Sequence, residues 1–125
     1  MSRCRLLVVD DDIDVLRSVA LMLSLEGYCV MTANSGTSAS VLLSEHEFDV
    51  VITDLRMPVV DGYEIVKRTR QKSPCAGIIV TSRYIDEQAR KWIDENGLYG
   101  LEKPYNIHQI STILRDYQLR VPEEQ

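Results

Sequence analysis

Five side chains with distinct chemistry stand where short apolar runs of the sequence end. Asp10 and Asp11 follow LLVV, Asp54 follows VVIT, Thr81 closes GIIVT, and Lys103 follows LYGLE. If these runs are parallel strands, their carboxyl ends meet at one edge of a sheet, and the five side chains converge there. Carboxylates held that close repel one another unless a cation neutralises them.

The types of these side chains indicate phosphoryl chemistry that depends on a divalent ion. Oxygen ligands from Asp10, Asp11 and Asp54, without histidine or thiolate, suit Mg²⁺, which keeps several waters and binds phosphate oxygens. A carboxylate is also a nucleophile that forms an acyl phosphate. The Lys103 ammonium and the Thr81 hydroxyl are suited to contact the phosphoryl oxygens.

The elements that must position these residues follow from the apolar pattern. Five short β-branched runs predict strands, and periodic segments between them predict helices. The expected strands are Arg5–Val9, Tyr28–Thr32, Asp49–Thr53, Gly77–Thr81 and Leu98–Glu102, and the expected helices are Ile13–Glu26, Gly36–Glu45, Tyr63–Gln71, Tyr84–Glu95 and Ile107–Gln118. Unbroken apolar strands that alternate with helices predict a parallel sheet covered on both faces, an α/β doubly wound (βα)5 sandwich.

Helix ends are marked by residues that favour caps. Gly27 and Gly97 stand where helices should stop, and Ser35, Asp61 and Asn106 stand where helices should start. Asp12 belongs to the helix that follows the acidic pair, where a carboxylate suits the amino terminus.

Length and charge bound the function. With 125 residues, one domain over 1–120 is expected, and 121–125 is expected to be a tail or the start of a linker. A net charge of −5 argues against nucleic-acid binding by this domain alone. Cys4, Cys29 and Cys75 lack metal-ligand spacing and predict neither a disulfide framework nor a zinc site. Without a long apolar run, no membrane contact and a cytoplasmic location are expected.

Residues 5 to about 118 resemble the receiver domain of two-component response regulators. The matching segments are LLVVDDDIDVL, DVVITDLRMPVVDG, IIVTS and LEKPY, in that order. The resemblance implies a flavodoxin-like fold with strand order 2-1-3-4-5. It implies that Asp54 is the phosphoacceptor and that Asp10, Asp11, Asp54 and the backbone carbonyl of Arg56 bind Mg²⁺. Thr81 and Lys103 would contact the phosphoryl group, and the Lys103–Pro104 bond would be cis.

The resemblance also implies partners. The phosphoryl donor would be a histidine kinase or a phosphotransfer protein, and an output domain or partner protein would bind the face of the fourth helix, fifth strand and fifth helix. Trp92, Tyr99, Tyr105 and Tyr117 either line that face or pack in the core. The protein would not be an enzyme beyond its own phosphorylation and dephosphorylation.

One position departs from the family pattern. Receivers generally carry an aromatic residue three positions before the lysine, and Gly100 stands there in this sequence. Tyr99 would point to the opposite face of the strand unless a bulge shifts it. Activation is therefore expected to use backbone adjustment around Gly100 and repositioning of Tyr84, Tyr99 or Tyr105, with the fourth helix mobile. Arg56 and Arg83, beside the pocket, are expected to affect the access of water.

Other readings of the same residues remain open. The acidic residues after the first strand also fit a helix cap, and Asp54 also fits a turn after a strand. A Mg²⁺-dependent phosphohydrolase would use an aspartyl phosphate too, but such enzymes generally carry an acid/base aspartate where Arg56 stands. A degenerate receiver that only docks partners would be consistent with Gly100.

Overall fold

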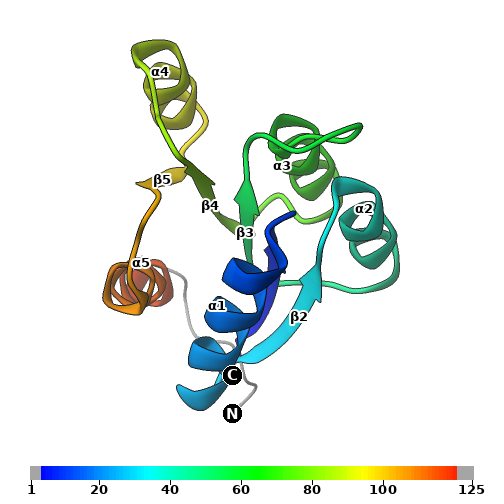
Figure 1. The fold of residues 1–125 in the computed structure, drawn as a ribbon, viewed down its shortest axis with the longest axis vertical. Coiled ribbons are helices and arrows are strands. Elements are labelled where there is room, and N and C mark those ends of the chain that lie inside the picture. The colour runs from blue at the N-terminus through cyan, green and yellow to red at the C-terminus, as the bar shows by residue number, and fades with distance from the viewer. Residues whose placement is uncertain (1–3, 121–125) are drawn as a thin grey trace.

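The computed structural model describes residues 4–120, in which five parallel strands alternate with five helices (Figure 1). The strands are β1 (Arg5–Val9), β2 (Cys29–Ala33), β3 (Val50–Asp54), β4 (Gly77–Ser82) and β5 (Tyr99–Glu102). The helices are α1 (Ile13–Leu25), α2 (Gly36–Glu45), α3 (Gly62–Lys72), α4 (Glu87–Glu95) and α5 (Ile107–Arg120). The strand order β2-β1-β3-β4-β5 confirms the predicted sandwich. The predicted tail at 121–125 lies outside the described residues.

Alternate residues of the strands face the two helical layers. Leu6 and Val8 of β1 pack with α1 and α5, whereas Leu7 and Val9 pack with α2 and α3. A third cluster under α4 contains Leu55, directly after β3. Burying a side chain of this size contributes roughly 1.5–3 kcal/mol, so both faces of the sheet hold the strands in place.

The helix caps agree with the sequence predictions. The Ser35 and Asp61 side chains accept hydrogen bonds from the third backbone N–H that follows, at 3.1 and 3.0 Å. Asn106 exchanges two such bonds with Gln109, at 2.9 and 3.0 Å, which is a capping box. Gly27 and Gly97 have positive φ angles of 99° and 64° after α1 and α4.

The fourth helix is shorter than predicted. It was expected from Tyr84, but α4 begins at Glu87 because the Asp86 side chain caps it, accepting from the Ala89 N–H at 2.8 Å. The Ile85 N–H is turned away from the helix and donates to Glu102 Oε2 at 2.8 Å. Residues 83–86 therefore form a loop at the carboxyl end of β4.

The first and last described segments lie side by side. The Cys4 thiol contacts the Gln118 side chain, and the Tyr117 hydroxyl donates to the Cys75 carbonyl at 3.0 Å. Cys4 precedes β1 and Cys75 precedes β4, so α5 ends at the amino edge of the sheet, opposite the predicted site. Within residues 4–120, none of the helices combines the length and the apolar character that a membrane span requires.

Candidate functional site

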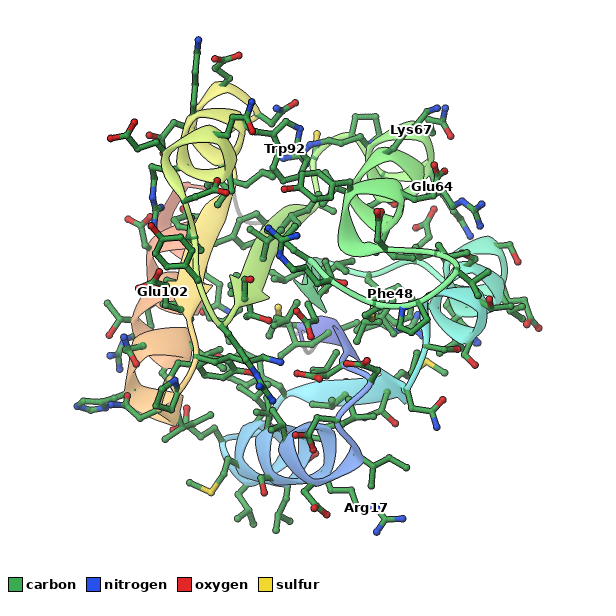
Figure 2. The ribbon with its side chains drawn as sticks, turned by 45° about the horizontal axis from the view of Figure 1, so that its top comes forward. Arg17, Phe48, Glu64, Lys67, Trp92 and Glu102 are labelled. Atoms are coloured by element: carbon green, nitrogen blue, oxygen red, sulfur yellow. The ribbon has the colours of Figure 1, made fainter. Side chains whose placement is uncertain are left out.

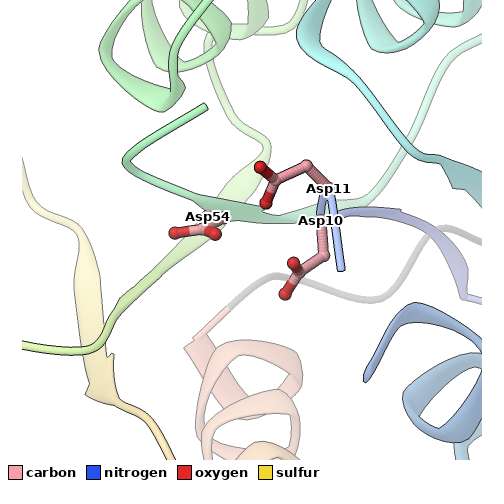
Figure 3. Close-up of side chains that lie close together, drawn as sticks. All are labelled: Asp10, Asp11 and Asp54. Atoms are coloured by element: carbon pink, nitrogen blue, oxygen red, sulfur yellow. The ribbon is translucent and has the colours of Figure 1, made fainter. Parts of the chain in front are cut away.

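Three carboxylates meet at the carboxyl edge of the sheet. Asp10 directly follows β1 and Asp54 ends β3; these neighbouring strands pair in the register Val9 to Thr53, which sets the two aspartates beside each other. Asp11 extends toward them from the loop before α1, and one oxygen from each carboxylate lies within 4.8 Å of the others (Figure 3). Asp10 and Asp54 are buried, whereas Asp11 is exposed. The cluster is thus open to solvent on the Asp11 side.

Lys103 is the counter-ion of the two buried carboxylates. Its Nζ lies 2.9 Å from Asp10 Oδ2 and 3.0 Å from Asp54 Oδ2. The backbone of Lys103 is fixed at the end of β5, where its N–H donates to the Ser82 carbonyl at 2.8 Å. The Lys103–Pro104 peptide bond is cis, as expected. The sequence placed Lys103 at this edge but did not predict that it bridges Asp10 and Asp54.

The protonation of Asp54 depends on opposing neighbours. Burial raises the pKa of the Asp54 carboxyl and the charge of Asp10 raises it further, while Lys103 and the Arg56 N–H act to lower it; the net direction is upward. Burial alone would lower the pKa of Lys103, but its bonds to Asp10 and Asp54 outweigh burial and raise it. Lys103 therefore keeps its positive charge. That single charge does not fully offset the effects that raise the pKa of Asp54.

The residues present fit a divalent ion. All side-chain donors in the cluster are carboxylate oxygens, the ligands that suit Mg²⁺. The Arg56 N–H donates to Asp54 Oδ1 at 3.3 Å, so the chain turns back over Asp54 at that residue. This position is consistent with the Arg56 carbonyl as a further ligand, which remains a prediction.

Thr81 lies next to Asp54 on the neighbouring strand. The two residues are partners in the β3–β4 register, and the Leu55 N–H donates to the Thr81 carbonyl at 2.8 Å. Partners in adjacent parallel strands present their side chains to the same face of the sheet. The Thr81 and Asp54 side chains therefore lie on one face. The structure thus brings together all five residues that the sequence selected.

The loop from β3 to α3 is packed tightly against the phosphoacceptor candidate. A Cβ atom on Gly62 would lie 2.3 Å from the Asp54 carbonyl oxygen, so only glycine permits this approach. A Cβ atom on Gly36 would likewise clash with the Val60 carbonyl oxygen. Between them, the Val60 N–H donates to the Pro58 carbonyl at 2.8 Å across Val59, whose φ is 68°. This γ-turn at a β-branched residue is strained, and no sequence signal predicted it.

A cavity of about 1070 Å³ opens above Asp54. Its lining includes Arg56, Arg83, Tyr84 and Tyr105, and also Val15 and Ser18 of α1. The cavity is much larger than a phosphoryl group, so a donor side chain can enter beside Asp54. The sequence did not lead us to select Val15 and Ser18 as cavity residues. They are three residues apart, however, and share a helix face just after the acidic pair.

The space over Gly100 is occupied by α4 and the loop before it. A Cβ atom there would lie 3.0 Å from Ile93 Cδ1, 3.1 Å from Arg90 Nη1 and 3.3 Å from Ile85 Cδ1. Tyr99 faces the other side of the sheet, where its hydroxyl donates to Asp116 Oδ2 of α5 at 2.7 Å. The prediction for Tyr99 is confirmed, and the three atoms nearest to a Cβ on Gly100 all belong to side chains without a ring.

Comparisons with known proteins give one consistent result. Residues 6–115 match the profile of the response regulator receiver domain. The chain is 35% identical over 117 residues to the sensor histidine kinase RcsC of Escherichia coli, covering 93% of this chain and 12% of RcsC. It is 35% identical over 115 residues to a CpxR homologue, a transcriptional regulatory protein of Haemophilus influenzae, covering 89% of this chain and 50% of that protein. The chain thus spans half or less of these relatives.

A solved structure agrees over nearly the whole chain. The chemotaxis protein CheY4 of Vibrio cholerae superposes with a TM-score of 0.84 at 30% sequence identity, over 93% of this chain and 99% of CheY4. A CheY-like receiver domain protein of Methanospirillum hungatei has a TM-score of 0.86 at 23% identity, over 94% of this chain and 96% of that one. The latter likeness concerns the fold alone.

Proposed function

The chain belongs to the response regulator receiver domain family, and from this premise we propose that Asp54 accepts a phosphoryl group from a phosphohistidine. The single observation that carries the proposal is the cluster of Asp10, Asp11 and Asp54, with Lys103 bonded to two of its members. The donor would be a histidine kinase or a phosphotransfer protein. Because such donors are made from ATP inside the cell, the proposal includes a cytoplasmic location.

The transfer follows from the placement of the side chains. A carboxylate oxygen of Asp54 attacks phosphorus while the bond from phosphorus to the donor's imidazole nitrogen breaks. The imidazole nitrogen keeps the electron pair of that bond and takes up a proton from water. Lys103 lies 3.0 Å from Asp54, within reach of a phosphoryl oxygen bound there, and the Thr81 hydroxyl donates to another oxygen.

Mg²⁺ is the proposed cofactor, held by Asp10, Asp11, Asp54 and the Arg56 backbone carbonyl. When bound, it neutralises charge on the phosphoryl oxygens and on the carboxylates. Lys103, 2.9 Å from Asp10 and 3.0 Å from Asp54, supplies positive charge at the same cluster.

The proposed role is a switch that reacts with its own phosphoryl group and turns over no other substrate. Arg56 stands two residues after Asp54, where a phosphohydrolase would carry its acid/base aspartate. It is exposed at the rim of the cavity. The output would be an attached domain or a partner protein that binds the face formed by α4, β5 and α5. The hydrogen bond between Tyr99 and Asp116 joins β5 to α5 and supports this face as one surface.

The test is phosphorylation with acetyl phosphate and Mg²⁺, followed by the mass of the intact protein. We expect a gain of one phosphoryl group in the wild type and none in Asp54→Asn, which removes the nucleophile with little change of shape. The matched control is Asp49→Asn, because Asp49 precedes the same strand at its other end and accepts the Arg5 N–H at 2.7 Å. Equal incorporation in wild type and Asp54→Asn would overturn the assignment, as would no incorporation in the wild type.

A further inference from the structure

Helix α4 is joined to the neighbouring helix by a pair of aromatic rings. The centroids of Tyr63 on α3 and Trp92 on α4 lie 4.5 Å apart, with the ring planes at 54°. Figure 2 shows Trp92 between the two helices. For Trp92 the sequence leaves open the face of α4, β5 and α5 or the core, and in the structure its ring contacts Tyr63 of α3 and packs against a core cluster. Rings at this distance and tilt attract one another beyond the burial of their surface.

Tyr63 directly follows the residue that touches the backbone of Asp54. The Gly62 N–H donates to the Leu55 carbonyl at 2.9 Å, and a Cβ on Gly62 would lie 2.6 Å from Leu55 Cα. A shift of the backbone at Asp54 or Leu55 must therefore displace Gly62, and Tyr63 with it.

Leu55 provides a second connection in the same direction. It belongs to the apolar cluster that contains Ile93 of α4, and Trp92 packs against this cluster. Leu55 is only 2% exposed, so the residue after Asp54 cannot move without changing contacts to α4.

Helix α4 itself has few other buried contacts. It has nine residues, and Ala89 and Ile93 are the two that are buried. A short helix with so little buried surface is the kind of element that moves at low cost in free energy. The contact between Tyr63 and Trp92 is thus a substantial part of what holds α4 in position.

None of the three tyrosines expected to move supplies one of the three atoms nearest to a Cβ on Gly100. Tyr84 is 69% exposed, the Tyr99 hydroxyl is bonded on the α5 side, and Tyr105 packs with the cluster of α1 and α5. Over Gly100 lie aliphatic ends of Ile85 and Ile93 and the Arg90 guanidinium. None of these is a ring that exchanges between an outer and an inner position.

We propose that the Tyr63–Trp92 contact couples Asp54 to α4, through Leu55 and Gly62, in place of an aromatic residue on β5. This inference rests on the proposed function, since phosphorylation supplies the shift at Asp54. Tyr63 and Trp92 are positioning residues in this scheme and do not touch the phosphoryl group. A modification at Asp54 moves α4 only as far as such contacts differ between the two states.

The test uses amide exchange of residues 87–95 and the emission of Trp92, the one tryptophan of the chain. Each is measured with and without Mg²⁺ and beryllofluoride, an acyl-phosphate mimic. In the wild type we expect both to change. Tyr63→Leu keeps apolar bulk but removes the ring, and we expect most of both changes to be lost. Tyr63→Phe keeps the ring and is the matched control, in which both changes are retained.

The same variants are phosphorylated with acetyl phosphate, which separates the coupling from the chemistry. We expect equal incorporation in wild type, Tyr63→Leu and Tyr63→Phe. Trp92→Leu should lose the exchange response of 87–95 as Tyr63→Leu does, which tests the pair from its other side. A full exchange response in a folded Tyr63→Leu that incorporates phosphate would overturn the coupling alone. Absence of incorporation in the wild type would overturn the proposed function and the coupling with it.

Discussion

At the scale of single residues, Lys103 does two things at once. It contacts both Asp10 and Asp54, at 2.9 and 3.0 Å, and offsets part of their negative charge; in the proposed function it also contacts a phosphoryl group on Asp54. Formation of such a group would move negative charge outward along the Asp54 side chain, next to the Lys103 ammonium. Under this proposal, the ion pair in the structure already lies where the phosphorylated side chain would form.

The backbone at Val59 is strained. Its φ of 68° is unfavourable for a β-branched residue by roughly 1–2 kcal/mol, and its side chain is 96% exposed, so little packing compensates. We expect Val59→Gly to raise the free energy of unfolding by about 0.5–1.5 kcal/mol, because glycine has no Cβ atom to clash at a positive φ. Urea denaturation measures the change. Val41→Gly, at a 52% exposed position within α2, should give no gain; equal gains in both would argue against strain at Val59.

The cysteines should differ in reactivity. Burial raises the pKa of the Cys4 thiol from 9.0 to about 11, and the charge of Asp49 adds to the effect, whereas Cys29 and Cys75 are exposed. Because the thiolate is the reactive form, we expect iodoacetamide to alkylate two cysteines quickly at pH 8 and Cys4 slowly. Intact mass over time measures this, and three equal rates would contradict it.

The same shift of the Cys4 pKa affects stability. Between pH 9 and about 11 the thiol ionises in the unfolded chain while it stays protonated in the folded one. The unfolded state then binds fewer protons, so the contribution of Cys4 to stability is complete below pH 9 and is lost as the pH rises through this window.

At the scale of elements, Gly62 and Gly100 differ in the atoms that surround them. Gly62 faces backbone atoms of Asp54 and Leu55, whereas Gly100 faces the ends of flexible side chains. Backbone cannot give way as a side chain does, so the same substitution should have unequal effects.

We expect Gly62→Ala to lower the free energy of unfolding by about 1–3 kcal/mol and to slow phosphorylation by displacing Asp54. Gly100→Ala, its matched control, should change stability by less than about 1 kcal/mol, since the Ile93 and Arg90 side chains can adjust. Urea denaturation and the time course of mass gain test both. A Gly62→Ala protein as stable and as reactive as the wild type would show that the β3–α3 loop is not fixed against Asp54.

Elements and their ends were largely predictable from the sequence because the signals are local. The alternation of strands and helices correctly predicted the parallel sheet. Ser35 and Asp61 correctly predicted the starts of two helices. The start of α4 was placed too early because the apolar pattern extends through Ile85, whereas the Asp86 cap decides the boundary. The Tyr63–Trp92 contact and the side chains over Gly100 were not predictable, since they depend on how α3 and α4 lie against the sheet.

At the scale of the whole molecule, metal binding and folding are linked. A ligand that binds only the folded state stabilises it by about 2.7 kcal/mol at a free concentration of ~100 times its Kd. We expect Mg²⁺ to raise the melting temperature of the wild type and a chelator to reverse the rise. Asp11→Ala should lose this response, and without metal it should be at least as stable as the wild type because repulsion among the carboxylates falls.

The control for this prediction carries the same change of charge. Asp94→Ala also removes one negative charge from a protein of net charge −5, but Asp94 lies on α4 outside the cluster. It should keep the full response to Mg²⁺. A response that is the same in Asp11→Ala and Asp94→Ala would indicate that Mg²⁺ acts on the overall charge and binds no defined site.

The contact between Cys4 and Gln118 has a consequence for how such a domain can be built into larger proteins. Its first and last described segments adjoin at the amino edge of the sheet, while the cavity above Asp54 opens at the carboxyl edge. A domain with this geometry can be joined to a larger protein, by insertion or by fusion at either end, from the edge of the sheet opposite Asp54. The same geometry makes circular permutation feasible: a short linker across this junction would allow new termini in a surface loop, with every strand still in its place.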